Sequence, residues 1–282
     1  MDKQIIHHFI TNALAEDVGD GDHTSLATIP GGTIGKAKLL VKDTGILAGV
    51  ELALEIFSQV DPDLKVNIFL NDGARVKPKD IAFEVEGDAR NILTAERLVL
   101  NCMQRMSGIA TQTREIVDLL EGTNTKVLDT RKTTPGLRYL EKWAVRIGGG
   151  VNHRFGLYDM ILIKDNHVDY SGGIRQAIEN THAYLEQHGK KLAIEIEVRN
   201  LDELDQVLQT GGVNRILLDN FNFTDLLQAV NTIGGRFITE ASGGITIDNI
   251  RQYAECGVDY ISVGALTHSV KSLDLSLKAV KE

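Results

Sequence analysis

The sequence predicts an α/β protein, in which a small α/β domain is followed by a parallel (β/α) barrel. From about residue 125 onward, short apolar segments alternate with helical patterns, which is typical of parallel strands joined by crossover helices. Six or more such units within roughly 150 residues favour a barrel over a flat sheet. Residues 36–92 differ, because their short apolar runs are broken by Gly, Asp and Pro and predict a sheet-rich region.

The composition is typical of a soluble globular protein. The chain has 282 residues, of which 43% are hydrophobic and 24% charged. No apolar run approaches the roughly 20 residues of a membrane span, and no signal-peptide pattern precedes the first helix. The two cysteines, Cys102 and Cys256, cannot by themselves form a disulfide framework or a metal cluster. We therefore expect a cytoplasmic protein without a membrane partner.

The first domain is expected to span residues 1–107. Apolar residues at helical spacing predict an amphipathic helix over 2–18, and the acidic segment 16–22 that follows is expected to be a solvated loop. We interpret residues 36–92, with the short strands GKAKLLVK, GILAG, KVNIFL and IAFEVEG, as a small α/β domain with an exposed sheet.

A long helix is predicted over 93–121, with Thr94 as its N-cap. Ser107-Gly108 is expected to break it and to mark the domain boundary. The barrel is expected over 108–269, and a last helix over 270–282 is expected to pack on the first domain.

In the barrel region, expected strands alternate with expected helices. Its expected strands are KVLDT, DMILIK, LAIEIEV, RILLDN, RFITEAS and DYISVG, and its expected helices span 137–147, 173–188, 201–210, 223–232 and 247–256.

Polar side chains stand at the ends of these strands. They are Asp129, Thr130, Arg131, Lys132, Lys164, Glu197, Asp219, Asn220, Glu240 and Ser242. Barrel enzymes carry their chemistry at the carboxyl ends of the strands. Some of these residues could instead cap the next helix, but lysine and glutamate are poor caps. Glu195 and Glu197 are two residues apart and share one strand face.

A basic stretch, residues 126–167, contrasts with the formal net charge of −9 for the whole chain. Its cations are Lys126, Arg131, Lys132, Arg138, Lys142, Arg146, Arg154 and Lys164, joined by His153 and His167. A basic pocket in an acidic protein predicts a small, strongly anionic substrate. Nucleic acid would need a broad basic face, and it is not an expected partner.

Two glycine turns near the end of the chain predict a phosphate site. ASGGI contains Ser242, Gly243 and Gly244, and SVGAL contains Gly264. Glycine lets backbone N–H groups approach an anion, and phosphate sites recur at the late loops of such barrels. Tight strand-to-helix turns would explain the same glycines.

The motifs DTRKTTPGLR, GGGVNHRFGLYDMILIKDNH, IEIEV, ILLDN, EASGGI and VDYISVGAL together resemble the quinolinate phosphoribosyltransferase (decarboxylating) family. The resemblance implies an N-terminal open α/β sandwich and a C-terminal barrel with fewer than eight strands. It also implies the formation of nicotinate mononucleotide, pyrophosphate and CO₂ from quinolinate and phosphoribosyl pyrophosphate with Mg²⁺, in NAD biosynthesis. The family assembles as dimers in which one subunit completes the other's site, and a hexamer stays open here.

The resemblance also implies roles for particular residues. Quinolinate would be held by Arg131, His153, Arg154, Lys132 and the neighbouring subunit's Arg97. Lys132 and Lys164 would lie between substrate and pyrophosphate, while Glu197 and Asp219 would face the ribose and Mg²⁺. Glu195 stays open as an alternative to Glu197. Ser242, Gly243, Gly244 and Gly264 would hold the 5'-phosphate. Arg138, Asn166 and His167 lie in matching motifs without an assigned role.

Other functions remain open at this point. A related phosphoribosyltransferase for nicotinate or another small acid would share the phosphate turns but need fewer cations around the ring. A paralogue with an altered pocket is a further possibility. A barrel lyase could use Lys164 as a Schiff-base amine, although the neighbouring charges do not suggest the apolar pocket such a lysine needs. A non-catalytic binding protein, built on a lipoyl-like N-terminal half, would leave the strand-end polar residues unexplained.

Overall fold

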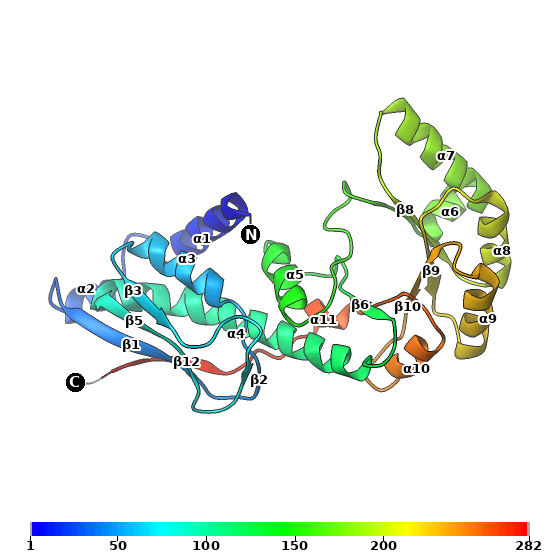
Figure 1. Ribbon diagram of the computed structural model, residues 1–282. Helices are drawn as coiled ribbons and strands as arrows, with labels where there is room; N and C mark the ends of the chain where they lie inside the picture. The colour runs from blue at the N-terminus through cyan, green and yellow to red at the C-terminus, as the bar shows by residue number, and fades with distance from the viewer. Residues whose placement is uncertain (1, 281–282) are drawn as a thin grey trace. The chain divides into compact units, whose positions relative to one another are not determined.

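The computed structural model describes residues 2–280, which divide into two compact units (Figure 1). Unit 1 contains residues up to Arg114 together with 133–149 and the segment from Leu266 onward, and unit 2 contains Glu115–Lys132 and Gly150–Ala265. A boundary between residues 107 and 108 would make each domain one continuous stretch of chain. The two units are instead discontinuous, because two later segments belong to unit 1.

Unit 1 is built on an antiparallel sheet of four strands. Their order is β12 (Leu275–Ala279), β1 (Ile34–Val41), β5 (Ile81–Asp88) and β3 (Lys65–Ile68). Along β1 every second side chain is buried, namely Ala37, Leu39 and Val41. This alternation means that one face of the sheet lies against the core while the other is more exposed. A short pair, β2 (Gly45–Ile46) with β4 (Arg75–Val76), completes the strands of this unit.

Helices supply the other layer of unit 1, and the expected α/β sandwich is confirmed. They are α1 (Lys3–Val18), α2 (His23–Thr28), α3 (Val50–Val60), α4 (Ala89–Leu119, in unit 1 as far as Arg114) and α5 (Arg138–Ile147). Asp2 caps α1 and Asp22 caps α2, each by accepting backbone N–H bonds with its carboxylate. The acidic segment expected to be only a loop therefore leads into a short helix.

The run VELALEIFSQV, which is not among the expected strands, forms α3, since its apolar residues recur at helical spacing. The expected break at Ser107-Gly108 is absent, and α4 continues through it. Ser107 instead exchanges hydrogen bonds with the backbone of Ala48, and Gly108 is small because a Cβ there would collide with the carbonyl of Lys271. Both residues serve close packing.

The N-terminus of α4 also differs from expectation. Thr94 lies inside the helix, where its hydroxyl donates to the carbonyl of Arg90. The carboxylate of Asp88 accepts from the backbone N–H groups of Arg90 and Asn91, so it performs the capping role that was expected of Thr94.

The segment expected to be the last helix contains a strand. Residues 275–279 form β12, which pairs with β1 through partners such as Leu277 and Leu39. Leu273, Leu275 and Leu277 are buried and alternate with other residues, which is the period of a strand. The segment belongs to unit 1, in which β12 is an edge strand of the sheet. Positions 281 and 282 of the expected helix lie outside the described residues.

Unit 2 contains six parallel strands, and the expected incomplete barrel is confirmed. Their order is β6 (Lys126–Leu128), β11 (Tyr260–Ser262), β10 (Ile238–Ser242), β9 (Arg215–Asp219), β8 (Ile194–Val198) and β7 (Ile161–Ile163). An isolated bridge joins Leu128 to Val151. The connecting helices are α6 (Asp165–Ser171), α7 (Ile174–Gln187), α8 (Leu201–Thr210), α9 (Phe223–Ile233) and α10 (Ile250–Glu255), followed by α11 (Ala265–His268). Figure 1 shows α6 to α10 along the outer side of these strands.

None of the helices in the described part of the chain is both long and apolar enough to cross a membrane.

Candidate active site

Polar side chains of unit 2 gather at the carboxyl ends of its parallel strands. Lys164 follows β7, Glu197 lies one residue from the end of β8, and Asp219 ends β9. Ser242 ends β10 and pairs in register with Asp219. Because the strands are parallel and hydrogen-bonded, their ends meet at one edge. The structure therefore brings together these four predicted residues.

The carboxylate of Asp219 is close enough to Glu197 to affect its ionisation. Burial raises the pKa of Glu197, and the negative charge of Asp219 raises it further. Burial also raises the pKa of Asp219, whereas a hydrogen bond from the Asn220 side chain and the charge of Lys164 lower it. Two partly buried carboxylates side by side are hard oxygen donors that suit Mg²⁺.

Two lysines lie beside this acid pair. The charge of Lys164 opposes the rise in pKa at both Glu197 and Asp219, and the charge of Lys132 does so at Asp219. Both lysines are exposed. Lys164 is thus surrounded by carboxylates, not by the apolar side chains that a Schiff-base lysine needs.

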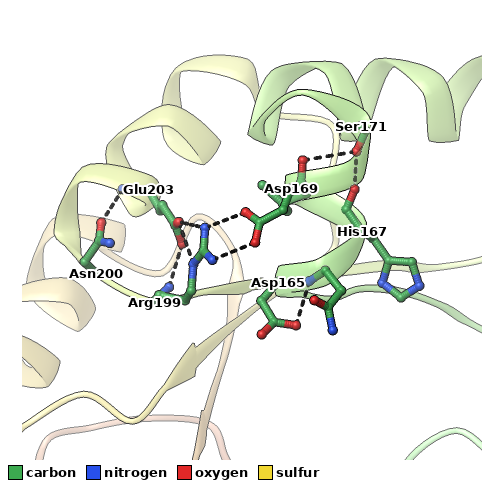
Figure 2. A network of polar contacts seen from close by, with 9 residues as sticks. Asp165, His167, Asp169, Ser171, Arg199, Asn200 and Glu203 are labelled. Carbon is green, nitrogen blue, oxygen red and sulfur yellow. Dashed lines mark hydrogen bonds and ion pairs between the residues drawn. The ribbon is translucent and has the colours of Figure 1, made fainter.

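A network of charged residues holds α6, the helix that begins directly after Lys164. The guanidinium of Arg199 contacts both carboxylate oxygens of Asp169, at 3.0 and 3.1 Å, and binds Glu203 through its Nε at 2.8 Å (Figure 2). Arg199 follows Glu197 by two residues, Asp169 lies on α6 and Glu203 lies on α8. Bidentate contacts of this kind fix orientation. They tie the turn that carries Lys164 to the end of the strand that carries Glu197.

Arg131 and Arg154 place two positive charges near each other. Burial lowers the pKa of Arg154, and the charge of Arg131 lowers it further. The Nε atom of Arg131 is buried and has no hydrogen-bond partner among the described residues. Arg154 donates from its Nη1 to the carbonyl of Met160 at 3.1 Å. Two adjacent guanidinium groups, one with an unused buried donor, are suited to an anion with two carboxylates.

His153 is held on several sides. Its backbone N–H donates to Asp129 at 2.8 Å, and its Nδ1 accepts from the backbone N–H of Arg154 at 2.7 Å. Its Nε2 lies 3.0 Å from a carboxylate oxygen of Glu195, and its side chain is 8% exposed. Both ring nitrogens therefore contact protein groups. The direct contact with quinolinate expected of His153 stays a prediction.

Glu195 and Glu197 face different partners although they share one strand face. Glu195 is fully buried beside His153, Arg215 and Glu240. Burial is the main cause of the raised pKa of Glu195, and the charge of Arg215 opposes it. Glu197 instead lies with Asp219 and Lys164, so its surroundings favour it over Glu195 for the ribose and metal role.

Arg215 was not identified as part of this region from the sequence, and Glu240, which was predicted only as a strand-end residue, is fully buried. Arg215 donates to Glu240 at 2.8 Å and stacks on the ring of Tyr260, with 4.7 Å from its Cζ to the ring centroid. Burial and the negative charge of Glu195 raise the pKa of Glu240 to about 7. Strand alternation could have placed both residues in this region. Arg215 is four residues from Asp219 on β9, and Glu240 is two residues from Ser242 on β10, so each shares a strand face with a predicted site residue.

The turn after β10 requires glycine. Gly243 and Gly244 have φ values of 90° and 61°, which other residues rarely adopt. Asn220, itself at φ 56°, donates its backbone N–H to the carbonyl of Ser242 at 2.8 Å. The helix that follows, α10, has six residues. The predicted phosphate turn is thus a glycine turn with two positive φ values, next to Asp219. The role of Gly264, after β11, stays a prediction.

The remaining predicted residues are divided between the units. Arg138, Lys142 and Arg146 lie on α5 in unit 1, so the basic stretch does not form one cluster within unit 2. Arg97 also lies in unit 1, on α4, where it is exposed and 3.0 Å from Glu96. Asn166 and His167 lie on α6 in unit 2, and Nδ1 of His167 accepts from the backbone N–H of Lys164.

Comparison with known proteins identifies the family. The model of the quinolinate phosphoribosyl transferase C-terminal domain matches residues 109–278, and that of the N-terminal domain matches residues 22–107. A quinolinate phosphoribosyltransferase [decarboxylating] of Nicotiana glauca is 48% identical, over 94% of this chain and 80% of its own length. A probable nicotinate-nucleotide pyrophosphorylase [carboxylating] of Bacillus subtilis is 42% identical, over 98% and 92% respectively.

Solved structures agree with this result. The nicotinate-nucleotide pyrophosphorylase of Francisella tularensis superposes with a TM-score of 0.92 at 38% identity, covering 99% of this chain and 98% of that one. The corresponding protein of Ehrlichia chaffeensis gives a TM-score of 0.91 at 36% identity, with 97% and 98% covered. Both units therefore have counterparts in sequence and structure, and the chain belongs to the quinolinate phosphoribosyltransferase family.

Proposed function

We propose that this chain is a pentosyltransferase of NAD biosynthesis, which transfers the phosphoribosyl group of phosphoribosyl pyrophosphate to quinolinate and decarboxylates the product. The products are nicotinate mononucleotide, pyrophosphate and CO₂. The observation that carries this proposal is the pairing of Arg131 and Arg154, two neighbouring guanidinium groups at one end of the barrel, beside the cluster of Lys132, Lys164, Glu197 and Asp219. Their arrangement suits an aromatic dianion next to a phosphorylated sugar.

The first step is attack by the pyridine nitrogen of quinolinate on the anomeric carbon of the sugar, while pyrophosphate leaves. Arg131 and Arg154 hold the two carboxylates and so orient the ring nitrogen. Lys132 and Lys164 offset the negative charge of the departing pyrophosphate, and Glu197 and Asp219 stabilise the positive charge that develops on the ribose. These contributions are positioning and electrostatic stabilisation, without a covalent enzyme intermediate.

The second step is loss of the 2-carboxylate as CO₂. The positively charged ring nitrogen stabilises the electron pair left on the ring carbon, and this carbon then takes a proton from water or from Lys132.

Mg²⁺ is the proposed metal, held by Glu197 and Asp219. Their donor set fits, because both are carboxylates and the negative charge of Asp219 already raises the pKa of Glu197. When bound, the ion neutralises charge on the pyrophosphate group. Asp219→Asn should increase the Mg²⁺ concentration for half-maximal activity by about tenfold or more, by analogy with the loss of other metal-supporting groups. An unchanged Mg²⁺ requirement in this variant would remove Asp219 from the metal site.

The active form is proposed to be a homodimer, in which the partner contributes its Arg97 to the quinolinate pocket. The exposure of Arg97 is compatible with that role. Mixing Arg97→Ala protein with protein inactivated at Lys132 tests it, because subunit exchange should restore part of the activity if sites are shared. Sedimentation would separate dimer from hexamer.

A cytoplasmic location is proposed as well. Cys102 and Cys256 are both free thiols, which suits a reducing compartment. The Nicotiana glauca relative is named as mitochondrial, so relatives do not decide the compartment. Cell fractionation with an antibody against the chain would test the proposal.

The decisive experiment is one incubation with quinolinate, phosphoribosyl pyrophosphate and Mg²⁺, in which CO₂ and nicotinate mononucleotide are followed together. A second tube contains nicotinate in place of quinolinate. Equal amounts of CO₂ and nucleotide from quinolinate alone are expected. Turnover of nicotinate without CO₂ would overturn the dianion pocket, and no turnover of either by folded protein would favour a paralogue with another substrate.

A further inference from the structure

A buried layer of charged side chains lies inside the barrel next to the proposed substrate pocket. Glu195 on β8 and Glu240 on β10 are fully buried, and Arg215 at the start of β9 lies between their strands. Arg215 donates to Glu240 at 2.8 Å, and Nε2 of His153 lies 3.0 Å from Glu195 and 3.5 Å from Glu240. The mechanism above uses none of these three barrel residues.

The backbone N–H of Arg154 determines which ring nitrogen of His153 carries the proton. Nδ1 accepts the backbone N–H of Arg154 at 2.7 Å, so Nδ1 carries a lone pair and no proton. A neutral imidazole has its single proton on the other nitrogen. Nε2 therefore carries the hydrogen, and this hydrogen is directed into a region that contains the buried carboxyl groups of Glu195 and Glu240.

The same three side chains have the donor types of a metal site, since ligand atoms of His153, Glu195 and Glu240 all lie within 4.8 Å of one another. A protonated Nε2 cannot bind a metal, because its lone pair is used. Arg215 also brings a positive charge to Glu240. The three side chains are therefore better suited to an interaction between the Nε2–H of His153 and the two carboxyl groups than to the binding of a metal cation.

We propose that Glu195, Glu240 and Arg215 form a positioning layer that holds His153 as its Nε2–H tautomer. Held in this way, the lone pair on Nδ1 anchors the backbone of Arg154, and Arg154 keeps its guanidinium in the pocket. Arg215 fixes the Glu240 carboxyl group, and the oxygens of the two buried carboxyl groups favour the tautomer with its N–H on their side. The part of this inference that concerns substrate binding rests on the proposed function.

The first test needs no variant. Nitrogen-15 NMR of the wild-type protein with labelled histidine separates the two tautomers, and comparison with His153→Asn identifies the signals of this ring. A single Nε2–H tautomer for His153 is expected. A dominant Nδ1–H tautomer or a doubly protonated ring would overturn the proposal, whatever the enzyme does with quinolinate.

The second test compares Glu195→Leu with Glu195→Gln. Leucine removes the carboxyl group that lies 3.0 Å from Nε2, so His153 should become a mixture of tautomers, and the KM for quinolinate should rise by about tenfold or more, as after loss of other supporting groups around a site. The KM for phosphoribosyl pyrophosphate should stay within about twofold. Glutamine keeps an oxygen next to Nε2 and should restore both the tautomer and the quinolinate KM. Unchanged tautomer and unchanged quinolinate KM in Glu195→Leu would contradict the proposal.

Thr239→Val is the matched control. Thr239 is buried on β10 next to Glu240, but alternation places it on the opposite face, where it bonds Asp259. This variant should lose stability and leave the His153 tautomer and the quinolinate KM unchanged. Failure of the wild type to turn over quinolinate would sink the proposed function alone, because the NMR result stands independently.

Discussion

The side-chain amide of Asn220 occupies the space that a side chain at Gly243 would need. Asn220 also donates its side-chain N–H to Asp219 at 2.6 Å and its backbone N–H to the carbonyl of Ser242 at 2.8 Å. One residue with a positive φ thus connects the acid at the end of β9 to the glycine turn after β10. The proposed metal site and the predicted phosphate turn therefore share Asn220 as a common contact, and we expect them to be coupled through it.

Gly243→Ala should therefore impair the binding of phosphoribosyl pyrophosphate. The new Cβ must displace Asn220, and the residue must adopt a left-handed φ, which costs about 1–3 kcal/mol. We expect the KM for phosphoribosyl pyrophosphate to rise about tenfold or more, measured by steady-state kinetics. Gly257→Ala is the control, because its φ of 87° is close to the 90° of Gly243 and the nearest atom to an added Cβ is 3.6 Å away. It should lose stability only. An unchanged KM in Gly243→Ala would contradict the coupling.

Loss of either guanidinium in the pocket should weaken quinolinate binding and leave the fold intact. Arg131→Ala and Arg154→Ala each remove charged hydrogen bonds worth about 2–3 kcal/mol, which corresponds to roughly 30- to 150-fold in affinity. Isothermal titration with quinolinate measures this directly. Arg236→Ala removes a guanidinium that bonds only carbonyls at the end of α9, Thr232 and Ile233, among the described residues, and should bind normally. Near-normal affinity in both pocket variants would overturn the assignment.

The stability of the protein should depend on pH through Glu240. Its pKa is raised from 4.5 to about 7, so the stabilising effect of its protonated form is complete below pH 4.5 and is lost as the pH rises through about 7. Glu240→Gln mimics the protonated form and lacks this loss. The free energy of unfolding of the variant relative to wild type should increase by up to about 3 kcal/mol between pH 4 and pH 8. Denaturant titrations at both pH values measure it, and a constant difference would contradict the raised pKa.

A buried ion pair in unit 1 should matter more to stability than an exposed one. Glu141 is 1% exposed and accepts from Nε of Arg105 at 2.7 Å and from the backbone N–H of Thr134 at 3.1 Å. Glu141→Ala leaves the guanidinium and a backbone donor without this partner, at a cost of about 3 kcal/mol or more. Glu84→Ala breaks a more exposed pair with Lys36, in which the side chains are 43% and 23% exposed, and should cost less than the loss of Glu141. Equal losses in urea unfolding would show that burial does not decide the difference.

Strand and helix periods in the sequence were sufficient for most of unit 2. The alternation of apolar segments predicted the parallel strands, and the strand-end rule alone predicted that Lys164, Glu197 and Asp219 lie at one edge. Residues 201–210 form a helix with the expected bounds. These features depend on neighbours within one or two turns of chain, so a local pattern carries them.

What the sequence by itself determined is therefore the α/β class, the family resemblance and the strand-end chemistry. Only the tertiary structure decided that 275–279 is a strand, since this depends on pairing with β1, which lies near the other end of the chain. The tertiary structure alone showed that Glu195 and Glu197 have different surroundings. Glu195 is buried beside Arg215 and Glu240, which come from the neighbouring strands β9 and β10. The tertiary structure also divided the basic stretch, with Arg138 in unit 1 and Arg154 in unit 2. Charge shows which residues are cations, but packing between distant segments decides which of them meet.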